Sequence, residues 1–364
     1  MRHYRPKLFV LSAFMLGLLL LTGAAEALVR ATHADQCQYS SFPGAEAFLP
    51  DPDLGWVLKP GFDAFISYDQ HRVSINSMGL RSPEVSAKQP GEFRVLCLGE
   101  STTFGAGLAN GRDYPSILEK LLSDKDGAGR YTVINAGVPA WSSYQSREFL
   151  RTRGAELSPD LVVVYHEVND YLPVLVRKTY FNQFGEMDSD EQLYGSRSFR
   201  ALSVLAKRSA LVRFALKTKL LLHMRTGQYG PAVNDLHQIG MPGMTPNLLL
   251  SGDFSRPENA EGNAPHPRRV TDQERVNNFY KINGLCKKMG AGLLIIHPCY
   301  AYTRRHECPA VQFCREEGVP MLEAYDVLGG RLDLFQDFMH PNAEGHKALA
   351  SALLEFIKQN KLPE

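Results

Sequence analysis

The sequence has almost no excess of charge of either sign. Its 40 Lys and Arg residues stand against 39 Asp and Glu residues, which leaves a formal net charge of +1. Proteins that bind nucleic acid through a broad basic surface carry a clear positive excess. The balance of charge therefore argues against nucleic acid as a partner.

The sequence also lacks the short motifs of several common binding sites. None of its 6 cysteines forms a Cys-x-x-Cys pair, so a structural zinc site is not expected. The glycines that follow residue 104 miss the spacing of a dinucleotide fingerprint, and no Gly-Lys-Ser/Thr ending makes them a phosphate-binding loop. Cys308 and Cys314 are near enough in sequence to pair, although connectivity cannot be deduced from sequence. We interpret His297 as a structural residue without the partners of a metal site.

The longest uncharged hydrophobic run lies at the amino terminus. Leu8–Ala25 contains no charged residue and follows three basic ones, Arg2, Arg5 and Lys7. Its length suits a helix that crosses a bilayer, and the basic flank predicts that the rest of the chain lies on the periplasmic, extracytoplasmic side. Ala25-Glu26-Ala27 also fits a cleavage site, so a secreted protein without its leader is the alternative. We favour a retained transmembrane anchor over residues 1–30.

The remaining chain divides into an extension and one main domain. Residues 31–90 are punctuated by Pro and Gly, and runs such as Ala64–Tyr68 predict hairpins that lean on the main domain. Over residues 91–364, apolar strands alternate with helical patterns, of which Val270–Lys288 and Ala343–Lys358 are examples. This alternation predicts a doubly wound α/β domain, whose parallel sheet is covered on both faces. The expected strands are Arg94–Leu98, Tyr131–Ala136, Leu161–Tyr165, Gly292–His297 and Pro320–Ala324.

An insertion at residues 171–270 separates the third and fourth expected strands. Its first part, Arg197–Arg225, is basic and helical in pattern, and its second part, Gly227–Pro267, is a predicted loop. We interpret the helical part as packed on the domain with a solvated basic face. The alternative is a lid or a helix on the membrane surface. The expected apolar stripe consists of Leu205, Leu211, Val212, Leu216 and Leu220.

Polar residues follow the predicted strands at positions that share one edge of a parallel sheet. Ser101 follows the first strand, Gly137 the second and Asn169 the third, while Asp337 and His340 precede the final helix. A carboxylate three residues before a histidine fixes the tautomer of the imidazole, whose other nitrogen then acts on a serine hydroxyl. Each residue alone also has a structural explanation as a turn or a helix cap. Together they indicate nucleophilic catalysis by serine.

These blocks, in this order, resemble the SGNH (GDSL-like) hydrolase family over residues 90–360. The upstream Leu54-Gly55-Trp56 and Asn76–Arg81 segments look like those of membrane-anchored bacterial members. The resemblance implies a flavodoxin-like α/β/α sandwich with a mainly parallel five-stranded sheet, and esterase chemistry that needs no metal and no organic cofactor.

The resemblance also implies a role for each site residue. Ser101 would be the nucleophile, His340 the general base and then acid, and Asp337 the residue that orients it. The N–H groups of Ser101 and Gly137 and the side chain of Asn169 would form the oxyanion hole.

Two positions depart from the family pattern. Glu100 stands where the family usually has Asp, which is a modest change in the reach of the carboxylate. Glu167 stands where the family has a second glycine, and from this larger change we expect a reshaped pocket or a shifted Asn169. The expected function is a serine esterase that acts on an O-acyl group, most simply O-acetyl, of an envelope carbohydrate or lipid substrate. An O-acyltransferase, a lipase or lysophospholipase, and a non-catalytic binding protein remain the alternatives.

Overall fold

A five-stranded parallel sheet forms the centre of the computed structural model, which describes residues 5–35, 47–66, 71–126, 130–171, 189–225, 269–301 and 305–362. The strands lie in the spatial order β6-β5-β7-β8-β9, and every pair is parallel. All five expected strands are confirmed, with bounds that shift by at most one residue. The strands are β5 (Phe93–Gly99), β6 (Tyr131–Gly137), β7 (Leu161–Tyr165), β8 (Gly292–His297) and β9 (Met321–Glu323).

Alternate residues of the central strand β5 face two different hydrophobic cores. Val95 and Cys97 lie in the core beneath α3 and α13, whereas Leu96 and Leu98 lie in the core beneath α4, α10 and α11. All four side chains are fully buried, as the strands of a doubly covered parallel sheet require. The fold is therefore a flavodoxin-like α/β/α sandwich. The covering helices are α3 (Tyr114–Asp126), α4 (Ser143–Leu157), α10 (Asp272–Met289), α11 (Pro309–Glu317) and α13 (Ala343–Gln359).

Local sequence explains where the covering helices begin and end. Thr271 accepts a hydrogen bond from the N–H of Glu274 and forms a capping box with it at the start of α10, and Gly290 ends that helix with a left-handed φ of 71°. The Asn342 side chain accepts hydrogen bonds from the N–H groups of Glu344 and Gly345, which starts α13. The start of α13 matters for function because the Asp337–His340 segment lies immediately before it.

Two antiparallel hairpins occupy the stretch before the main sheet, in agreement with the turn residues there. The first joins β1 (Phe48–Asp51) to β2 (Gly55–Leu58), and the second joins β3 (Asp63–Phe65) to β4 (Arg72–Ser74). Trp56 on β2 is buried and donates its indole N–H to the carbonyl of Pro139, just after β6. The first hairpin therefore packs against a loop at the carboxyl edge of the sheet.

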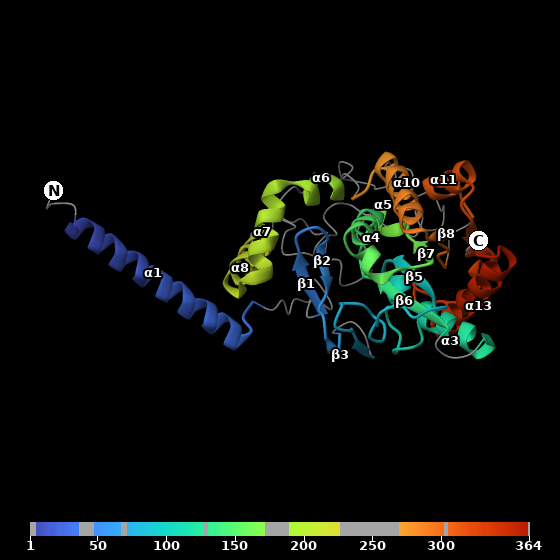
Figure 1. The fold of residues 1–364 in the computed structure, drawn as a ribbon, viewed down its shortest axis with the longest axis horizontal. Helices are drawn as coiled ribbons and strands as arrows, with labels where there is room; N and C mark the ends of the chain where they lie inside the picture. The colour runs from blue at the N-terminus through green and yellow to red at the C-terminus, as the bar shows by residue number, and fades with distance from the viewer. Residues whose placement is uncertain are drawn as a thin grey trace.

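The amino-terminal helix α1 (Arg5–Thr32) projects from one end of the molecule (Figure 1). Within it, Phe9–Thr32 is long and apolar enough to cross a membrane, and its most apolar stretch is not buried against the rest of the described chain. Only the carboxyl end of α1 contacts α8 (Ala210–Arg225). The same length and composition occur in signal sequences, so the helix alone supports both readings of the amino terminus.

The basic segment of the insertion forms two helices rather than one. The helix α7 (Arg197–Arg208) is followed by Ser209, whose hydroxyl accepts the N–H of Val212 at the start of α8 (Ala210–Arg225). This local cap breaks the continuous helix that the pattern predicts. Leu216 is buried, but Leu205 is 56% exposed, so the expected stripe does not face the domain throughout. The predicted loop at 227–267 and the side chain of Leu220 lie outside the described residues.

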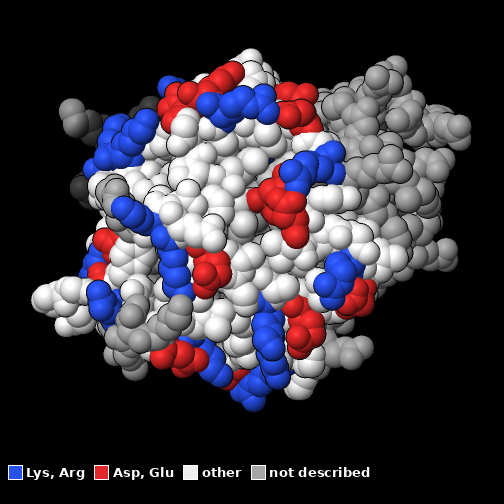
Figure 2. Space-filling model, turned by 90° about the vertical axis from the view of Figure 1, so that its right-hand side faces the viewer, with Lys and Arg blue, Asp and Glu red and all other residues white. Residues whose placement is uncertain are grey.

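The five described cysteines are all free and buried. Cys308 and Cys314 do not pair, which corrects the bridge considered from their spacing, and Cys37 lies outside the described residues. Figure 2 shows the side of the molecule farthest from α1, where Lys and Arg are interspersed with Asp and Glu and no single sign of charge prevails.

Candidate active site

Ser101 begins a one-turn helix at the carboxyl end of β5. This helix, α2 (Ser101–Phe104), ends at Gly105, whose left-handed φ of 85° reverses the chain. A Cβ atom at Gly99 or Gly137 would overlap Thr103, because α2 packs directly on the ends of β5 and β6. The two glycines therefore let the serine turn approach the sheet closely.

His340 joins Ser101 to Asp337. Its Nε2 lies 2.7 Å from Ser101 Oγ, and its Nδ1 lies 2.7 Å from Asp337 Oδ2. The other carboxylate oxygen, Oδ1, accepts the backbone N–H groups of Met339 and His340, each at 2.7 Å. Asp337 thus closes a tight turn and orients the imidazole at the same time. The three residues predicted from the sequence therefore lie in contact, although Ser101 and His340 are near opposite ends of the main domain in the sequence.

Two hydrogen bonds made by Gln336 fix the loop that carries His340. The N–H of Gln336 donates to the carbonyl of His340 at 3.0 Å, and the Gln336 side chain donates to the carbonyl of Ala106 at 2.6 Å. The second bond connects the histidine loop to the segment that follows the Ser101 helix. These contacts limit the motion of the imidazole relative to the serine, as a proton transfer between them requires.

The electrostatics of the group suit a proton transfer. Burial opposes ionisation of Asp337, but the hydrogen bond and charge of His340 outweigh it and hold the pKa of this carboxyl below its usual range. Asp337 is therefore an anion at neutral pH, and a carboxylate anion beside an imidazole would stabilise the imidazolium formed by proton transfer.

Asn169 lies beside the serine turn, in α5 (Val168–Tyr171) at the end of β7. It is buried, and its N–H donates to Oε2 of Glu100 at 3.3 Å. Burial, followed by the negative charge of Asp170, raises the pKa of Glu100 well above its usual range. A neutral Glu100 thus connects the residue before Ser101 to the Asn169 turn.

Gly137 has a different environment from the one expected of an oxyanion donor. Its N–H donates to Oδ1 of Asn135 at 3.0 Å, within its own strand. Besides the Thr103 overlap, a Cβ atom here would meet the backbone N of Phe104, so packing alone requires a glycine. Its role as an oxyanion donor stays a prediction.

Sequence reasoning missed the residues that brace the serine turn from the extension. Arg81 is buried and donates to the carbonyls of Phe104 (3.0 Å), Gly105 (2.7 Å) and Leu108 (2.5 Å). Its guanidinium also lies 4.6 Å from the centre of the Phe104 ring. Arg81 is the last residue of the Asn76–Arg81 motif identified in the sequence. The motif did not indicate that Arg81 contacts the serine turn.

A second unanticipated feature is the turn after β6. Ala140 has a φ of 65°, which is unusual for a residue with a side chain. Arg269, which is fully buried, donates to the Ala140 carbonyl at 2.6 Å. The indole N–H of Trp56 donates to the carbonyl of the preceding residue, Pro139. The turn is therefore held in a strained conformation from two sides.

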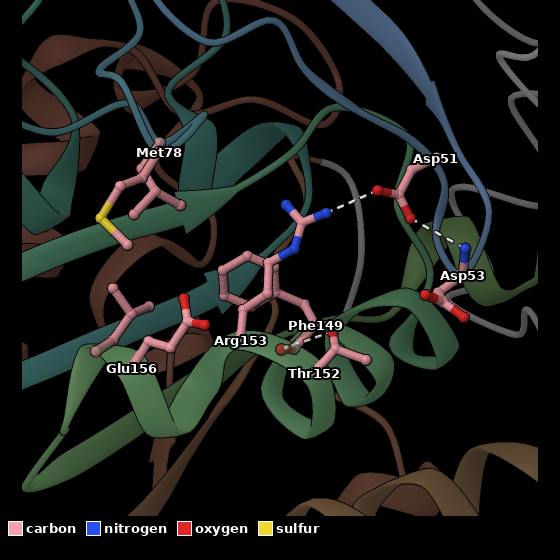
Figure 3. Close-up of a pocket in the computed structure, with 9 residues that line it drawn as sticks. Asp51, Asp53, Met78, Phe149, Thr152, Arg153 and Glu156 are labelled. Carbon is pink, nitrogen blue, oxygen red and sulfur yellow. Dashed lines mark hydrogen bonds and ion pairs between the residues drawn. The ribbon is translucent and has the colours of Figure 1, made fainter. Parts of the chain in front are cut away.

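A surface pocket of about 410 Å³ lies between the first hairpin and α4 (Figure 3). Arg153 reaches across it to Asp51, with 2.7 Å between Nη2 and Oδ2. Its lining shares no residue with the Ser101, His340 and Asp337 group. The pocket is thus separate from the chemistry described above.

Serine, histidine and aspartate joined in this way at the edge of a parallel sheet are typical of serine hydrolases. The chain belongs to the GDSL-like lipase/acylhydrolase family, whose sequence profile it matches over residues 95–353, and it is accordingly a hydrolase of ester bonds. No curated protein is significantly similar to it in sequence.

Solved structures of similar proteins include esterases and lipases. The acetylxylan esterase Axe2 from Geobacillus stearothermophilus is 15% identical, with 73% of this chain and 95% of that chain covered and a TM-score of 0.41. TesA is 14% identical, with 73% and 98% covered and a TM-score of 0.41. A GDSL-like lipase from Bacteroides thetaiotaomicron is 14% identical, with 76% and 93% covered and a TM-score of 0.39. Likeness at these scores adds nothing to the sequence match.

Proposed function

We propose that this protein is a membrane-anchored serine esterase that removes an O-acyl group, most simply acetyl, from a carbohydrate or other substrate of the cell envelope. The continuous contact from Ser101 through His340 to Asp337 carries this proposal. An ester hydrolase needs a nucleophile, a base that accepts its proton and a group that orients the base. These three side chains supply one of each.

In the proposed reaction, Ser101 Oγ attacks the ester carbonyl while His340 Nε2 takes its proton. Asp337 stabilises the imidazolium. The tetrahedral intermediate collapses when His340 gives the proton to the leaving alcohol, which breaks the ester C–O bond and leaves an acyl group on Ser101. Water then attacks the acyl-enzyme with His340 as base, and the acid is released as the serine regains its proton.

The negative charge that develops on the carbonyl oxygen needs fixed donors. We assign the N–H of Ser101 and the side-chain amide of Asn169 to this role, with Gly137 as a third donor once its N–H leaves Asn135. The link between the Asn169 N–H and Glu100 supports the assignment, since it holds the asparagine turn beside the nucleophile. Removing one such donor costs about 10²–10³ in rate in other acyl-transfer enzymes.

Contacts of α1 support a retained anchor. The Glu26 carboxylate accepts the N–H groups of Ala210 and Leu211 at 2.8 and 2.9 Å, and the Ser209 hydroxyl at 2.7 Å. It thereby satisfies donors at the start of α8 that a helix cannot satisfy internally. Cleavage after Ala27 would remove this cap. An anchor that is part of the fold keeps the enzyme at the extracytoplasmic face of the membrane.

A lipase or lysophospholipase is the second candidate, because basic residues and apolar side chains lie together near the anchor. The helices α7 and α8 lie beside the end of α1 (Figure 1). They carry Lys207 and Arg208 as well as the exposed Leu205 and Phe214. Such a surface is suited to anionic lipid headgroups.

The test is hydrolysis of p-nitrophenyl esters of increasing chain length by the full-length chain in detergent. We expect turnover of acetate that Ser101→Ala and His340→Ala abolish, whereas Ser351→Ala, at an exposed serine on α13, leaves it unchanged. Release of acetate from an O-acetylated glycan would then identify the substrate class. A preference for long acyl chains would favour the lipase instead, and turnover by Ser101→Ala would contradict the proposal.

A further inference from the structure

Four potential metal ligands converge behind the Asn169 turn, apart from the proposed catalytic residues. They are Glu167, His297, His306 and Cys308, and one ligand atom of each lies within 4.8 Å of those of the other three. They come from the ends of β7 and β8 and from the segment that leads into α11. Since the residues are distant in sequence, their spacing does not form a recognisable metal motif.

Two atoms in the cluster are buried without a nitrogen or oxygen partner. Oε2 of Glu167 has no hydrogen-bond partner, and Nε2 of His297 has no nitrogen or oxygen partner, although the Cys308 thiol interacts with this imidazole. The two residues are 0% and 1% exposed. An unsatisfied polar atom in the interior costs about 1–3 kcal/mol. Both atoms are of the kind that bind a transition metal, so a bound cation would satisfy the two together.

The surroundings of His297 match those of a metal-bound histidine. Its Nδ1 lies 2.8 Å from Oε2 of Glu323. A carboxylate at this position favours the proton on Nδ1, which makes Nε2 the nitrogen that would bind a metal. A carboxylate behind the histidine is the usual partner of a zinc ligand. His306, the least buried of the four, has a side chain 18% exposed and provides a route from solvent.

We infer that Glu167, His297, His306 and Cys308 form a binding site for one divalent transition-metal ion, with Zn²⁺ as the best fit. Two nitrogens, one sulfur and one oxygen are a zinc ligand set, and bonds of about 2.0–2.3 Å place tetrahedral ligands roughly 3.3–3.8 Å apart. The ligand atoms lie within 4.8 Å of one another, so binding requires them to move together by up to about 1 Å relative to these distances. On binding, the Cys308 thiol releases its proton to solvent, so that one thiolate and one carboxylate balance the charge of the ion.

The role of this ion would be structural. None of its ligands is Ser101, His340 or Asp337, and four protein ligands leave no position for substrate. The ion would tie the 305–308 segment to the strand ends, two residues before Asn169. Glu167, the departure from the family's glycine, thus gains a function, and the expectation that His297 lacks metal-site partners gives way to this proposal.

Cobalt binding tests the site without an activity assay. The full-length chain in detergent is stripped with a chelator, dialysed and titrated with Co²⁺, which reports tetrahedral geometry in the visible spectrum and thiolate ligation in the near ultraviolet. We expect one Co²⁺ per chain, displaced by Zn²⁺. Cys308→Ser should lose the thiolate band, whereas the matched variant Cys314→Ser, at the neighbouring buried thiol, should keep it.

A second variant keeps the test decisive if Cys308→Ser does not fold. His306→Gln changes the most accessible ligand and should weaken Co²⁺ binding at least about 100-fold. Substitution of a residue that only hydrogen-bonds to a metal ligand already lowers metal affinity about 10–100-fold. Ser101→Ala should bind Co²⁺ like the unchanged chain, which separates this site from the esterase proposal. A folded chain that binds no stoichiometric Co²⁺, or a thiolate band that persists in folded Cys308→Ser, would overturn the inference.

Discussion

Asp337→Asn is the substitution that isolates the orientation of His340. Asparagine keeps a side-chain oxygen that accepts the two backbone N–H groups at 2.7 Å, so the turn should survive. The other position, where Oδ2 now accepts from Nδ1, becomes an amide N–H donor. To avoid two facing donors, the imidazole changes tautomer and carries its proton on Nε2. That nitrogen then has no lone pair for the proton of Ser101.

The magnitude follows from the loss of the base. We expect kcat on p-nitrophenyl acetate to fall about 10³–10⁴-fold, which corresponds to about 4–5.5 kcal/mol of transition-state stabilisation. The free energy of unfolding should change by only about 1 kcal/mol, because one charge-assisted hydrogen bond near the surface is replaced. Thermal unfolding and steady-state kinetics measure the two quantities. Asp333→Asn, at an exposed ion pair with Arg331, is the control. A loss below tenfold in a folded variant would refute the role of Asp337.

Three further substitutions test the supports of the serine turn. Arg81→Ala removes three hydrogen bonds donated by a buried guanidinium, although the carbonyls of Phe104 and Gly105 keep a weaker donor. It should lower the free energy of unfolding by about 3–5 kcal/mol in denaturant titrations. The control Arg72→Ala, at an exposed arginine, should lower the free energy of unfolding by less than about 1 kcal/mol. Gly137→Ala places a Cβ against the α2 backbone and should cost about 1–3 kcal/mol with a loss of activity, whereas Gly195→Ala, with open space at its Cβ, should not. Glu100→Gln mimics the neutral acid. The pKa of Glu100 in the folded chain lies above its unfolded value, so its contribution to stability is complete below about pH 4.5 and declines as the pH rises. The free energy of unfolding of Glu100→Gln should therefore increase relative to that of the unchanged chain between about pH 4.5 and 7. A pH-independent difference would contradict a neutral Glu100.

The sheet was predictable because its strands bury both faces. Leu161–Tyr165 is an uninterrupted apolar run, and its observed bounds are those expected. The pairing of Asp337 with His340 was also predictable, since three residues in a turn fix their separation. By contrast, the break at Ser209 depends on a side-chain cap and on Glu26, which is distant in sequence. Periodicity carries no information on such contacts.

The residues that brace the site could not be predicted from the sequence, because their contacts also join segments that are distant in the chain. Arg81 and Trp56 reach the serine edge from the extension, and a motif alone does not say which backbone groups a side chain will meet. The cluster around Glu167 shows the effect most clearly. Its four members look unrelated in the sequence. Glu167 and His297 become neighbours because β7 and β8 are adjacent in the sheet, and the segment before α11 brings His306 and Cys308 to the same place.

The most direct test of the account is covalent labelling of the nucleophile. The full-length chain is treated with a fluorophosphonate, and the modified residue is located by peptide mass spectrometry. The account predicts one adduct on Ser101, none in Ser101→Ala, and much slower labelling in His340→Ala because the hydroxyl then lacks its base. A folded, unlabelled chain, or an adduct on any other residue, would contradict the assignment of Ser101 as the nucleophile.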